Sequence, residues 1–318
     1  MPELEEIARG VVAEGVAPAA AVGFARFSAS GWQTHTGGAT HAFFDLASLT
    51  KPMTAVAVAR SHLDRHAALR ELLPEVAGTP VGSATIEQLL AHRAGLEAHV
   101  LLPPEDPLRA AAAAIRANPK GAVYSDLGYL LAGVALARHV GVVDAGAAIE
   151  RFVVHEDLAT ARTLRARTDF DARVQPTEGD LRGIVHDENA RLLTKDGGSG
   201  HAGMFGTAAA MLAFAADAAD YVETDEGRWL VTPWKDGATN LAGFDGKSPT
   251  GSSAGDRCGP RTFGHLGFTG TSFWIDPDAR IITLLLTNRV HPTRDNVKIR
   301  AARPRVHDAL FELACTAP

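Results

Sequence analysis

Hydrophobic and polar residues follow two different periodicities along the chain, and the periodicity changes with position. Near the start, apolar residues recur at helical spacing, at positions Leu4, Ile7, Ala8, Val11 and Val12. This spacing predicts an amphipathic helix that ends at Gly15 and Pro18. Residues 19–27 and 32–37 form two short β-like runs, and the Ser-Ala-Ser-Gly between them predicts a hairpin.

The middle of the chain, from Ser48 to about Asp220, has mostly helical spacing and is rich in alanine. Its clearest helices are predicted over 85–92 and 127–139, and prolines and glycines interrupt the pattern between them and after them, at 103, 104, 107 and 195–200. Small and polar residues predict a loop over 236–259, which we expect to shape the substrate pocket.

Three β-like runs and a closing helix follow that loop. The strands are predicted over 263–268, 271–275 and 280–287, the last two joined by a turn at 276–279, and the helix contains Val306, Leu310 and Leu313. Strands at both ends with helices between them predict an α+β fold, with one antiparallel sheet built from the two termini and a helical insertion. Short turns between neighbouring strands favour antiparallel pairing, because parallel crossovers need a dozen or more residues.

Composition narrows the functional classes. The chain has 318 residues, of which 31 are basic and 37 acidic, and its formal charge of −6 argues against a general nucleic-acid binder. No segment approaches the roughly 18 consecutive apolar residues of a membrane span. The acidic, amphipathic start, MPELEEIARG, differs from a secretory signal, so we expect a cytoplasmic protein, with a removed leader as the alternative. Cys258 and Cys315 can pair in principle, but two separate thiols are the simpler interpretation.

The candidate chemistry begins at Ser48 and Lys51, which are three residues apart. On a helix this spacing places both side chains on one face, one turn apart. A serine hydroxyl needs a nearby base to act as a nucleophile, and a lysine serves as that base only if its pKa is lowered. A serine near a helix N-terminus also lies close to backbone N–H groups that stabilise an oxyanion. Alone the motif is weak, because an exposed helix turn with a solvated lysine has the same pattern.

Two further motifs follow in the order known for serine-lysine hydrolases. The first is Tyr124-Ser125-Asp126, which opens a predicted helix, and the second is the segment 264–270, which begins on a predicted strand. A tyrosine near the serine can relay a proton to a leaving group. A strand edge beside Ser48 can supply a second oxyanion donor from its backbone.

With these motifs the chain resembles the β-lactamase-related serine hydrolases, which include class C β-lactamases, DD-peptidases and family VIII esterases. Five segments in order carry the resemblance, which covers nearly the whole chain: 48–54, 85–96, 124–129, 200–208 and 286–292. The resemblance implies the β-lactamase/transpeptidase-like α+β fold, an antiparallel sheet flanked by helices with an inserted all-helical domain. We expect a single domain, in which 1–60 and 205–318 form the sheet subdomain and 61–204 the helical one.

The resemblance also implies the catalytic roles. Ser48 would be acylated, and Lys51 would deprotonate it, together with Tyr124. Tyr124 would then protonate the leaving group and help to activate the deacylating water. The backbone N–H groups of Ser48 and Phe268 would form the oxyanion hole. No cofactor is expected, and the expected partner is a small-molecule or peptide substrate; the sequence does not predict the oligomeric state.

Two positions depart from the β-lactamase pattern. Asp126 stands where β-lactamases usually carry the asparagine that contacts the substrate amide. His265-Leu266-Gly267 replaces Lys-Thr-Gly, which removes a fixed positive charge and a hydroxyl donor. With Asp126, His265 and Gly267 as substrate-binding residues, these changes favour an esterase, amidase or peptidase-like hydrolase over an efficient β-lactamase.

Other functions remain open at this point. The chain could be a non-catalytic or slowly deacylating penicillin-binding sensor. It could also be a metal-dependent hydrolase using the segment 186–189 with His201, but no Cys or HExxH partner accompanies that segment, so no metal is expected. His201 is a candidate pocket residue or a structural histidine. Asp45 is expected to cap or turn the chain, and the four tryptophans to serve as core or interface residues, with Trp229 or Trp234 as a possible cleft border.

Overall fold

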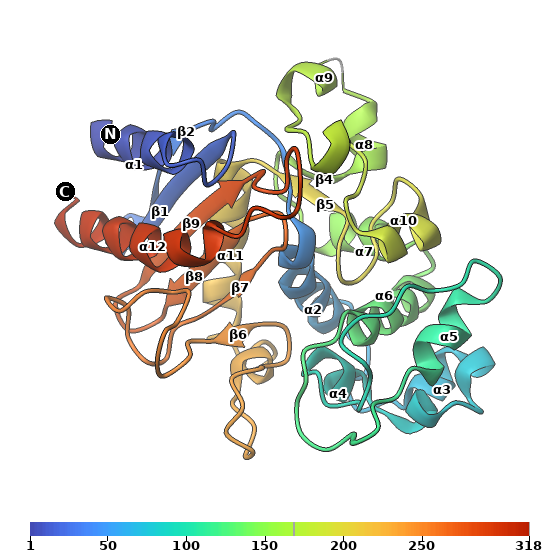
Figure 1. Cartoon of the computed structure of the whole chain (residues 1–318). Helices are drawn as coiled ribbons and strands as arrows, with labels where there is room; N and C mark the ends of the chain where they lie inside the picture. The colour runs from blue at the N-terminus through green and yellow to red at the C-terminus, as the bar shows by residue number, and fades with distance from the viewer. Residues whose placement is uncertain (168, 318) are drawn as a thin grey trace.

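The computed structural model describes residues 1–167 and 169–317 and contains a six-stranded sheet with the order β2-β1-β9-β8-β7-β6 (Figure 1). All neighbouring strands in it are antiparallel. Their bounds are β1 Ala20–Ser28, β2 Gly31–Gly38, β6 Asp245–Gly246, β7 Phe263–Leu266, β8 Ser272–Asp276 and β9 Ile281–Thr287. Because β1 pairs directly with β9, the two ends of the chain build one sheet, and the α+β prediction is confirmed.

Alternating residues of the central strands enter two separate cores. On β1, Val22 and Phe24 pack with α1 (Pro2–Ala13) and α12 (Ile299–Thr316), which cover one face of the sheet (Figure 1). Ala21 and Ala25 point to the other face, which α11 (Ala208–Tyr221) covers. This period of two is the expected pattern for strands buried on both faces. The predicted opening and closing helices are therefore the two helices of one layer.

The middle of the chain lies beside the sheet and is mostly helical (Figure 1). Its helices are α2 Thr50–Arg60, α3 Leu69–Leu72, α4 Ile86–Leu90, α5 Pro107–Ala113, α6 Asp126–Val140, α7 Ala145–Phe152, α8 Ala161–Arg165, α9 Phe170–Arg173 and α10 Glu188–Thr194. Thr85 starts α4 through a capping box with Gln88, and Gly141 ends α6 in the left-handed conformation.

A second, small antiparallel sheet was not predicted. It contains β3 (Phe44–Asp45), β5 (Met204–Gly206) and β4 (Leu158–Thr160), in that order. Strands of two or three residues are too short for a period of two to appear in the sequence. Since β5 links β3 to β4 across position 204, the proposed boundary between the two subdomains stays a prediction.

Three smaller expectations can now be compared with the structure. The strand predicted over 263–268 ends at Leu266, so Gly267 and Phe268 belong to the turn that follows it. Cys258 is buried and Cys315 exposed, and both are free, which confirms two separate thiols. Among the described residues, no helix has by itself the length and apolar composition of a membrane span, whereas α6 and α7 together, bent by 65°, would have both.

Candidate active site

Ser48 lies on a short 3₁₀ turn, Ala47–Leu49, that leads directly into α2. Ala47 has a φ of 48°, the left-handed region, which costs a non-glycine residue about 1–2 kcal/mol. The side chain of Asp45 holds this conformation: one carboxylate oxygen accepts the Ala47 N–H at 2.8 Å, and the other accepts the His186 N–H at 2.7 Å. Asp45 is thus the turn residue that the sequence predicted, and it fixes the backbone that presents Ser48.

The ammonium of Lys51 joins three side chains from two distant segments. Its Nζ donates to Ser48 Oγ at 2.8 Å, to the Tyr124 hydroxyl at 2.6 Å and to Asp126 Oδ1 at 2.8 Å. The Lys51 side chain is fully buried. An ammonium has three donors, so each of its protons has an acceptor.

Tyr124 reaches this group because its neighbours fix the loop before α6. The Ser125 N–H donates to His92 Nδ1 at 2.9 Å, and the Ser125 hydroxyl donates to the Glu97 carbonyl at 2.6 Å. The His92 ring packs against the Tyr124 ring with centroids 4.7 Å apart. Segment 85–96 therefore supports the position of Tyr124, although it contributes no residue to the group around Lys51.

The charges of this group differ from the sequence-based expectation of a lysine with a lowered pKa. Burial alone disfavours the Lys51 ammonium, but Asp126 and the Tyr124 phenol outweigh burial, and the pKa of Lys51 is raised above its ordinary value. Burial, with a contribution from Asp126, raises the pKa of Tyr124 to about 12. Burial opposes the ionised form of Asp126 too, but Lys51 and His99 hold the Asp126 pKa far below its usual range. At neutral pH the group therefore contains a Lys51–Asp126 ion pair and a neutral phenol.

Ser48, Tyr124 and Asp126 open onto a cavity of about 560 Å³. The predicted loop 236–259 contributes no residue to its lining, so the expectation that this loop shapes the pocket is wrong. The cavity lining includes instead Gly267, Phe268 and four arginines that the sequence analysis did not select as site residues: Arg289, Arg294, Arg300 and Arg303. The dense basic residues between 289 and 305 are the only signal by which they could have been found.

The second candidate oxyanion donor lies in the turn after β7. Among the described residues, no acceptor contacts the Phe268 N–H, while the Gly267 N–H donates to the Thr271 carbonyl at 2.7 Å. The half-exposed Phe268 ring stacks on His186, with centroids 5.6 Å apart, and carries the Arg289 guanidinium 4.4 Å above its centroid. The turn thus offers an unoccupied N–H at the cavity wall, and its role as an oxyanion donor stays a prediction.

Gly267 has no room for a side chain. A Cβ there would lie 1.9 Å from Thr271 Oγ1 and 2.7 Å from the backbone oxygen of Leu46, which belongs to the nucleophile turn and cannot swing away. We expect Gly267→Ala to lower the free energy of unfolding by about 1–3 kcal/mol and to lower kcat. Gly10→Ala is the control, because a Cβ at this position in α1 meets nothing within 4 Å and should stabilise the helix by about 0.5–1 kcal/mol. Urea unfolding compares the two; equal stability and activity would contradict the close approach.

The two histidines proposed to bind substrate lie outside the cavity lining. His265 is buried on β7, its Nδ1 lies 2.8 Å from the Leu266 carbonyl oxygen, and burial lowers its pKa, so it carries no charge at neutral pH. His201 is buried between Asp187, at 2.8 Å, and the Ser199 hydroxyl, at 3.1 Å. Asp126 and Gly267, in contrast, do line the cavity.

One group of potential metal ligands lies at the cavity, and it differs from the set considered from the sequence. His99, Asp126 and Asp187 place ligand atoms within 4.8 Å of one another, and sequence reasoning had not selected His99. Asp126 and Asp187 already pair with Lys51 and His201, each at 2.8 Å. Because a side-chain nitrogen of Lys51 or His201 already contacts one oxygen of each carboxylate, the arrangement favours a hydrogen-bonded network rather than a metal ion.

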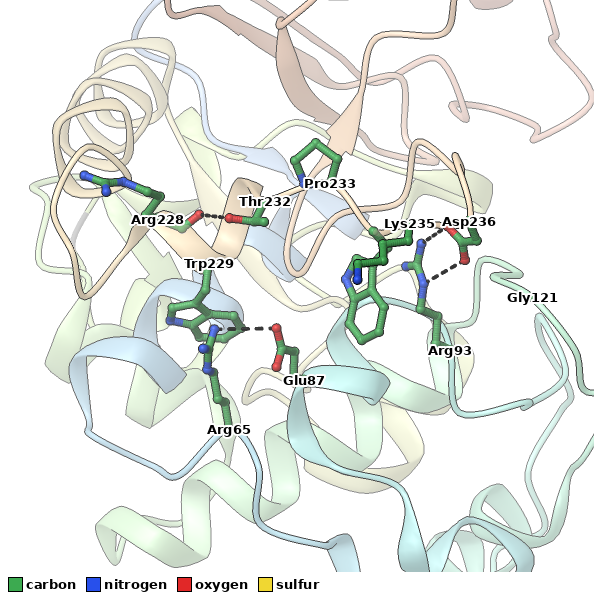
Figure 2. Close-up of a pocket in the computed structure, with 11 residues that line it drawn as sticks. Arg65, Glu87, Arg93, Gly121, Arg228, Trp229, Thr232, Pro233, Lys235 and Asp236 are labelled. Carbon is green, nitrogen blue, oxygen red and sulfur yellow. Dashed lines mark hydrogen bonds and ion pairs between the residues drawn. The ribbon is translucent and has the colours of Figure 1, made fainter.

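Trp229 and Trp234 do not border the Ser48 cavity, so that hypothesis is wrong. They line a separate cavity of about 730 Å³, shown in Figure 2, to which Ser48 does not contribute. The Arg65 guanidinium lies 5.0 Å from the Trp229 ring centroid, and the Arg93 guanidinium lies 4.5 Å from that of Trp234. These tryptophans therefore belong to the contact between the helical region and the segment after α11.

Comparison with known proteins adds the family context. The sequence model of the Beta-lactamase family matches residues 9–307. An Escherichia coli K12 protein described as "Putative D-alanyl-D-alanine carboxypeptidase" is 32% identical over 129 residues, which are 37% of this chain and 30% of that protein. The chain thus spans less than a third of that relative's length.

Two solved structures share the fold across their whole length. A class C beta lactamase from Rhodobacter sphaeroides superimposes with a TM-score of 0.72 at 15% identity, covering 99% of this chain and 100% of the other. EstCE1, described as a hydrolase with promiscuous acyltransferase activity, gives a TM-score of 0.68 at 18% identity, covering 98% of each chain. At these identities the likeness establishes the fold alone.

Proposed function

This chain belongs to the beta-lactamase family of serine hydrolases, and from that premise we propose that it hydrolyses an ester, amide or peptide through an acyl-enzyme on Ser48. The observation that supports this proposal most is the contact of Lys51 Nζ with Ser48 Oγ at 2.8 Å and with the Tyr124 hydroxyl at 2.6 Å. A nucleophile and its proton-transfer partners within hydrogen-bonding reach, at the wall of a cavity, are the arrangement that acyl transfer needs.

The substrate is better described as an ester or peptide than as a β-lactam. His265 takes the place of the lysine of the third motif, and burial keeps it uncharged and outside the cavity lining. The third motif therefore supplies no fixed positive charge to a substrate carboxylate. The fold shared with the hydrolase EstCE1 and the partial match to the carboxypeptidase-like relative agree with this substrate class.

The charges assign the proton-transfer roles within this proposal. In this proposal the first proton leaves Tyr124, because the Lys51 ammonium that remains 2.6 Å from its oxygen is kept charged by Asp126 and would stabilise the phenolate. The phenolate, stabilised by the Lys51 ammonium, then takes the Ser48 proton while Ser48 Oγ bonds to the carbonyl carbon and the carbonyl electron pair moves to the oxygen. When this intermediate collapses, the bond to the leaving group breaks and Tyr124 protonates that group. The sequence suggested Lys51 as the base. In this mechanism Tyr124 is the base, and the positive charge of Lys51 stabilises its phenolate form.

Deacylation repeats the sequence with water. Tyr124 accepts a proton from the water molecule that attacks the acyl carbon, and it returns a proton to Ser48 Oγ as the acid product leaves. Because its raised pKa keeps Tyr124 almost entirely protonated near neutral pH, the small phenolate fraction would slow deacylation as well as acylation. A penicillin-binding sensor that deacylates slowly is therefore the second candidate function.

Covalent labelling tests the proposal directly. The protein is incubated with p-nitrophenyl acetate, nitrocefin and a D-Ala-D-Ala peptide, product release is followed, and quenched samples are analysed by intact mass and peptide mapping. We expect steady ester hydrolysis that is insensitive to a chelator, weak nitrocefin turnover, and an acyl adduct on Ser48. A burst without a steady state would favour the sensor, and turnover with the adduct on another residue would refute the proposal.

A further inference from the structure

Arg303, on the second turn of α12, is a buried arginine that pairs with no acidic side chain in the part of the chain that the structure describes. Arg303 is 8% exposed, and among the described residues no carboxylate oxygen lies within 4.0 Å of its guanidinium nitrogens. Its Nε makes no hydrogen bond within the described chain. Burial and the neighbouring Arg289 lower the pKa of Arg303 to about 10, which still leaves it cationic at neutral pH. Burying a cation without a paired anion lowers the stability of the folded state. A functional role would explain why the chain carries Arg303 at this position.

The contacts of Arg303 converge on the turn that follows β7. Nη2 donates to the Gly267 carbonyl at 2.6 Å and to the Thr271 carbonyl at 3.0 Å, so one nitrogen joins the two ends of the turn. The Gly267 carbonyl also accepts the Gly270 N–H at 3.1 Å. On the other side of Phe268, Arg289 Nε donates to the Phe268 carbonyl at 2.8 Å. Two guanidinium groups therefore hold two successive carbonyls of this turn.

The peptide unit between Gly267 and Phe268 links Arg303 to the reaction. Its carbonyl belongs to Gly267 and its N–H to Phe268, and in a planar trans peptide the two point in opposite directions. The bond from Arg303 therefore fixes the direction of the Phe268 N–H, which no acceptor in the described chain occupies. A cation on the carbonyl oxygen also draws electron density from the N–H and strengthens it as a donor.

We infer that Arg303 is a positioning residue: it orients and polarises the Gly267–Phe268 peptide so that its N–H stabilises the oxyanion formed at Ser48. This inference rests on the proposed function, because the oxyanion exists only if Ser48 attacks a carbonyl. Gly267 completes the device, since its backbone is confined between Thr271 and the Leu46 oxygen of the nucleophile turn. Preorganised donors of this kind act mainly on the transition state and little on substrate binding.

The test compares Arg303→Met with Arg303→Lys. Methionine fills the space with an apolar chain and removes a buried charge that no carboxylate in the described chain compensates, so the variant should fold. We expect its kcat for p-nitrophenyl acetate to fall about 10–100-fold with KM within about twofold. Affinity for phenylboronic acid, whose serine adduct mimics the tetrahedral intermediate, should fall by a similar factor. Lysine keeps the cation and should recover part of kcat.

Arg305→Met provides the matched control on the same helix. The Arg305 side chain is exposed and pairs with Glu14 at the end of α1, the neighbouring helix of the same layer, and its loss should leave kcat and boronate affinity unchanged. An Arg303→Met variant that folds and keeps kcat within twofold would overturn the inference, as would a kcat loss with no change in boronate affinity. If Arg303→Met does not fold, Arg303→Gln carries the test, because its amide is polar but uncharged, and full kcat or no loss of boronate affinity in it would likewise overturn the inference. Covalent labelling of Ser48 distinguishes failure of the proposed function from failure of this inference. No adduct on wild-type Ser48 would refute the proposed function. An adduct that forms at the same rate in the wild type and in Arg303→Met would refute only the role of Arg303.

Discussion

Replacement of Ser48 by alanine is expected to lower kcat/KM for p-nitrophenyl acetate by at least about 1,000-fold. The reason is that the reaction loses the atom that forms the acyl bond, while the oxyanion donors and the cavity remain and keep only a residual acceleration. The fold should survive, because the hydroxyl contributes one hydrogen bond to Lys51, which keeps Tyr124 and Asp126 as acceptors. Steady-state kinetics measures the loss, and circular dichroism with thermal unfolding confirms the fold.

The matched control is Ser61→Ala, at the C-terminal end of α2, the helix that follows the Ser48 turn. The Ser61 hydroxyl donates to the Val58 carbonyl at 2.9 Å and has no contact with the Lys51 group, so its removal should leave kcat/KM within about twofold. Activity that survives Ser48→Ala at more than a few per cent of the wild-type level would mean that another nucleophile, or an activated water, attacks the substrate.

The fold could be predicted from the chain because its signals are local and long enough to detect. The β-like runs at 19–27 and 280–287 predicted a sheet built from the two termini, and the helical spacing predicted the opening and closing helices; the observed β1 and β9 lie within one residue of those runs. The predictions failed where elements are short. Strands β3, β4 and β5 have two or three residues each, and β3 pairs with a strand that lies about 160 positions away along the chain.

The site could be predicted only in part, for a similar reason. Motif order indicated Ser48, Lys51 and Tyr124 through the resemblance, and the structure brings these three side chains together. The four arginines were missed because their position depends on how the segment after β9 and the start of α12 pack against the turn after β7, which no local pattern in the sequence records. The charge state of Lys51 was missed because Asp126 was considered only as a substrate contact, and its 2.8 Å ion pair with Lys51 becomes visible only in three dimensions.

The Lys51–Asp126 ion pair should determine how kcat/KM depends on pH. Asp126 raises the pKa of both Lys51 and Tyr124, so the reactive form of the pair appears only as the pH rises toward their raised pKa values. Asp126→Asn removes this charge and lowers both pKa values. The acidic limb of the kcat/KM profile should therefore move to lower pH by at least about one unit. Each unit increases the deprotonated fraction about tenfold below the limb, and a weaker base offsets part of that, so a gain of about 3–10-fold is expected at pH 7.

The free energy of unfolding provides a second, independent test of Asp126→Asn. The folded-state pKa of Asp126 is depressed, so its contribution to stability is present above the unfolded pKa of about 3.9 and is lost as the pH falls toward the folded value. Asp126→Asn should therefore be less stable than the wild type at pH 7, by up to about 3–5 kcal/mol if Lys51 stays charged, and the difference should shrink at acidic pH. Asp217→Asn, which removes the carboxylate paired with Arg60 at 2.7 Å, should leave the pH profile of kcat/KM in place.

Both readouts depend on one assumption, that Lys51 carries a proton in the resting enzyme. If Lys51 were neutral, Asp126 would have no cation to stabilise, and Asp126→Asn would leave the acidic limb in place and cost little stability. Urea unfolding between pH 3 and pH 9 and kcat/KM between pH 5 and pH 10 decide between these states. An unmoved limb together with unchanged stability would show that Lys51 is itself the base, as in the interpretation drawn from the sequence, and Tyr124 would then act only as the proton donor to the leaving group.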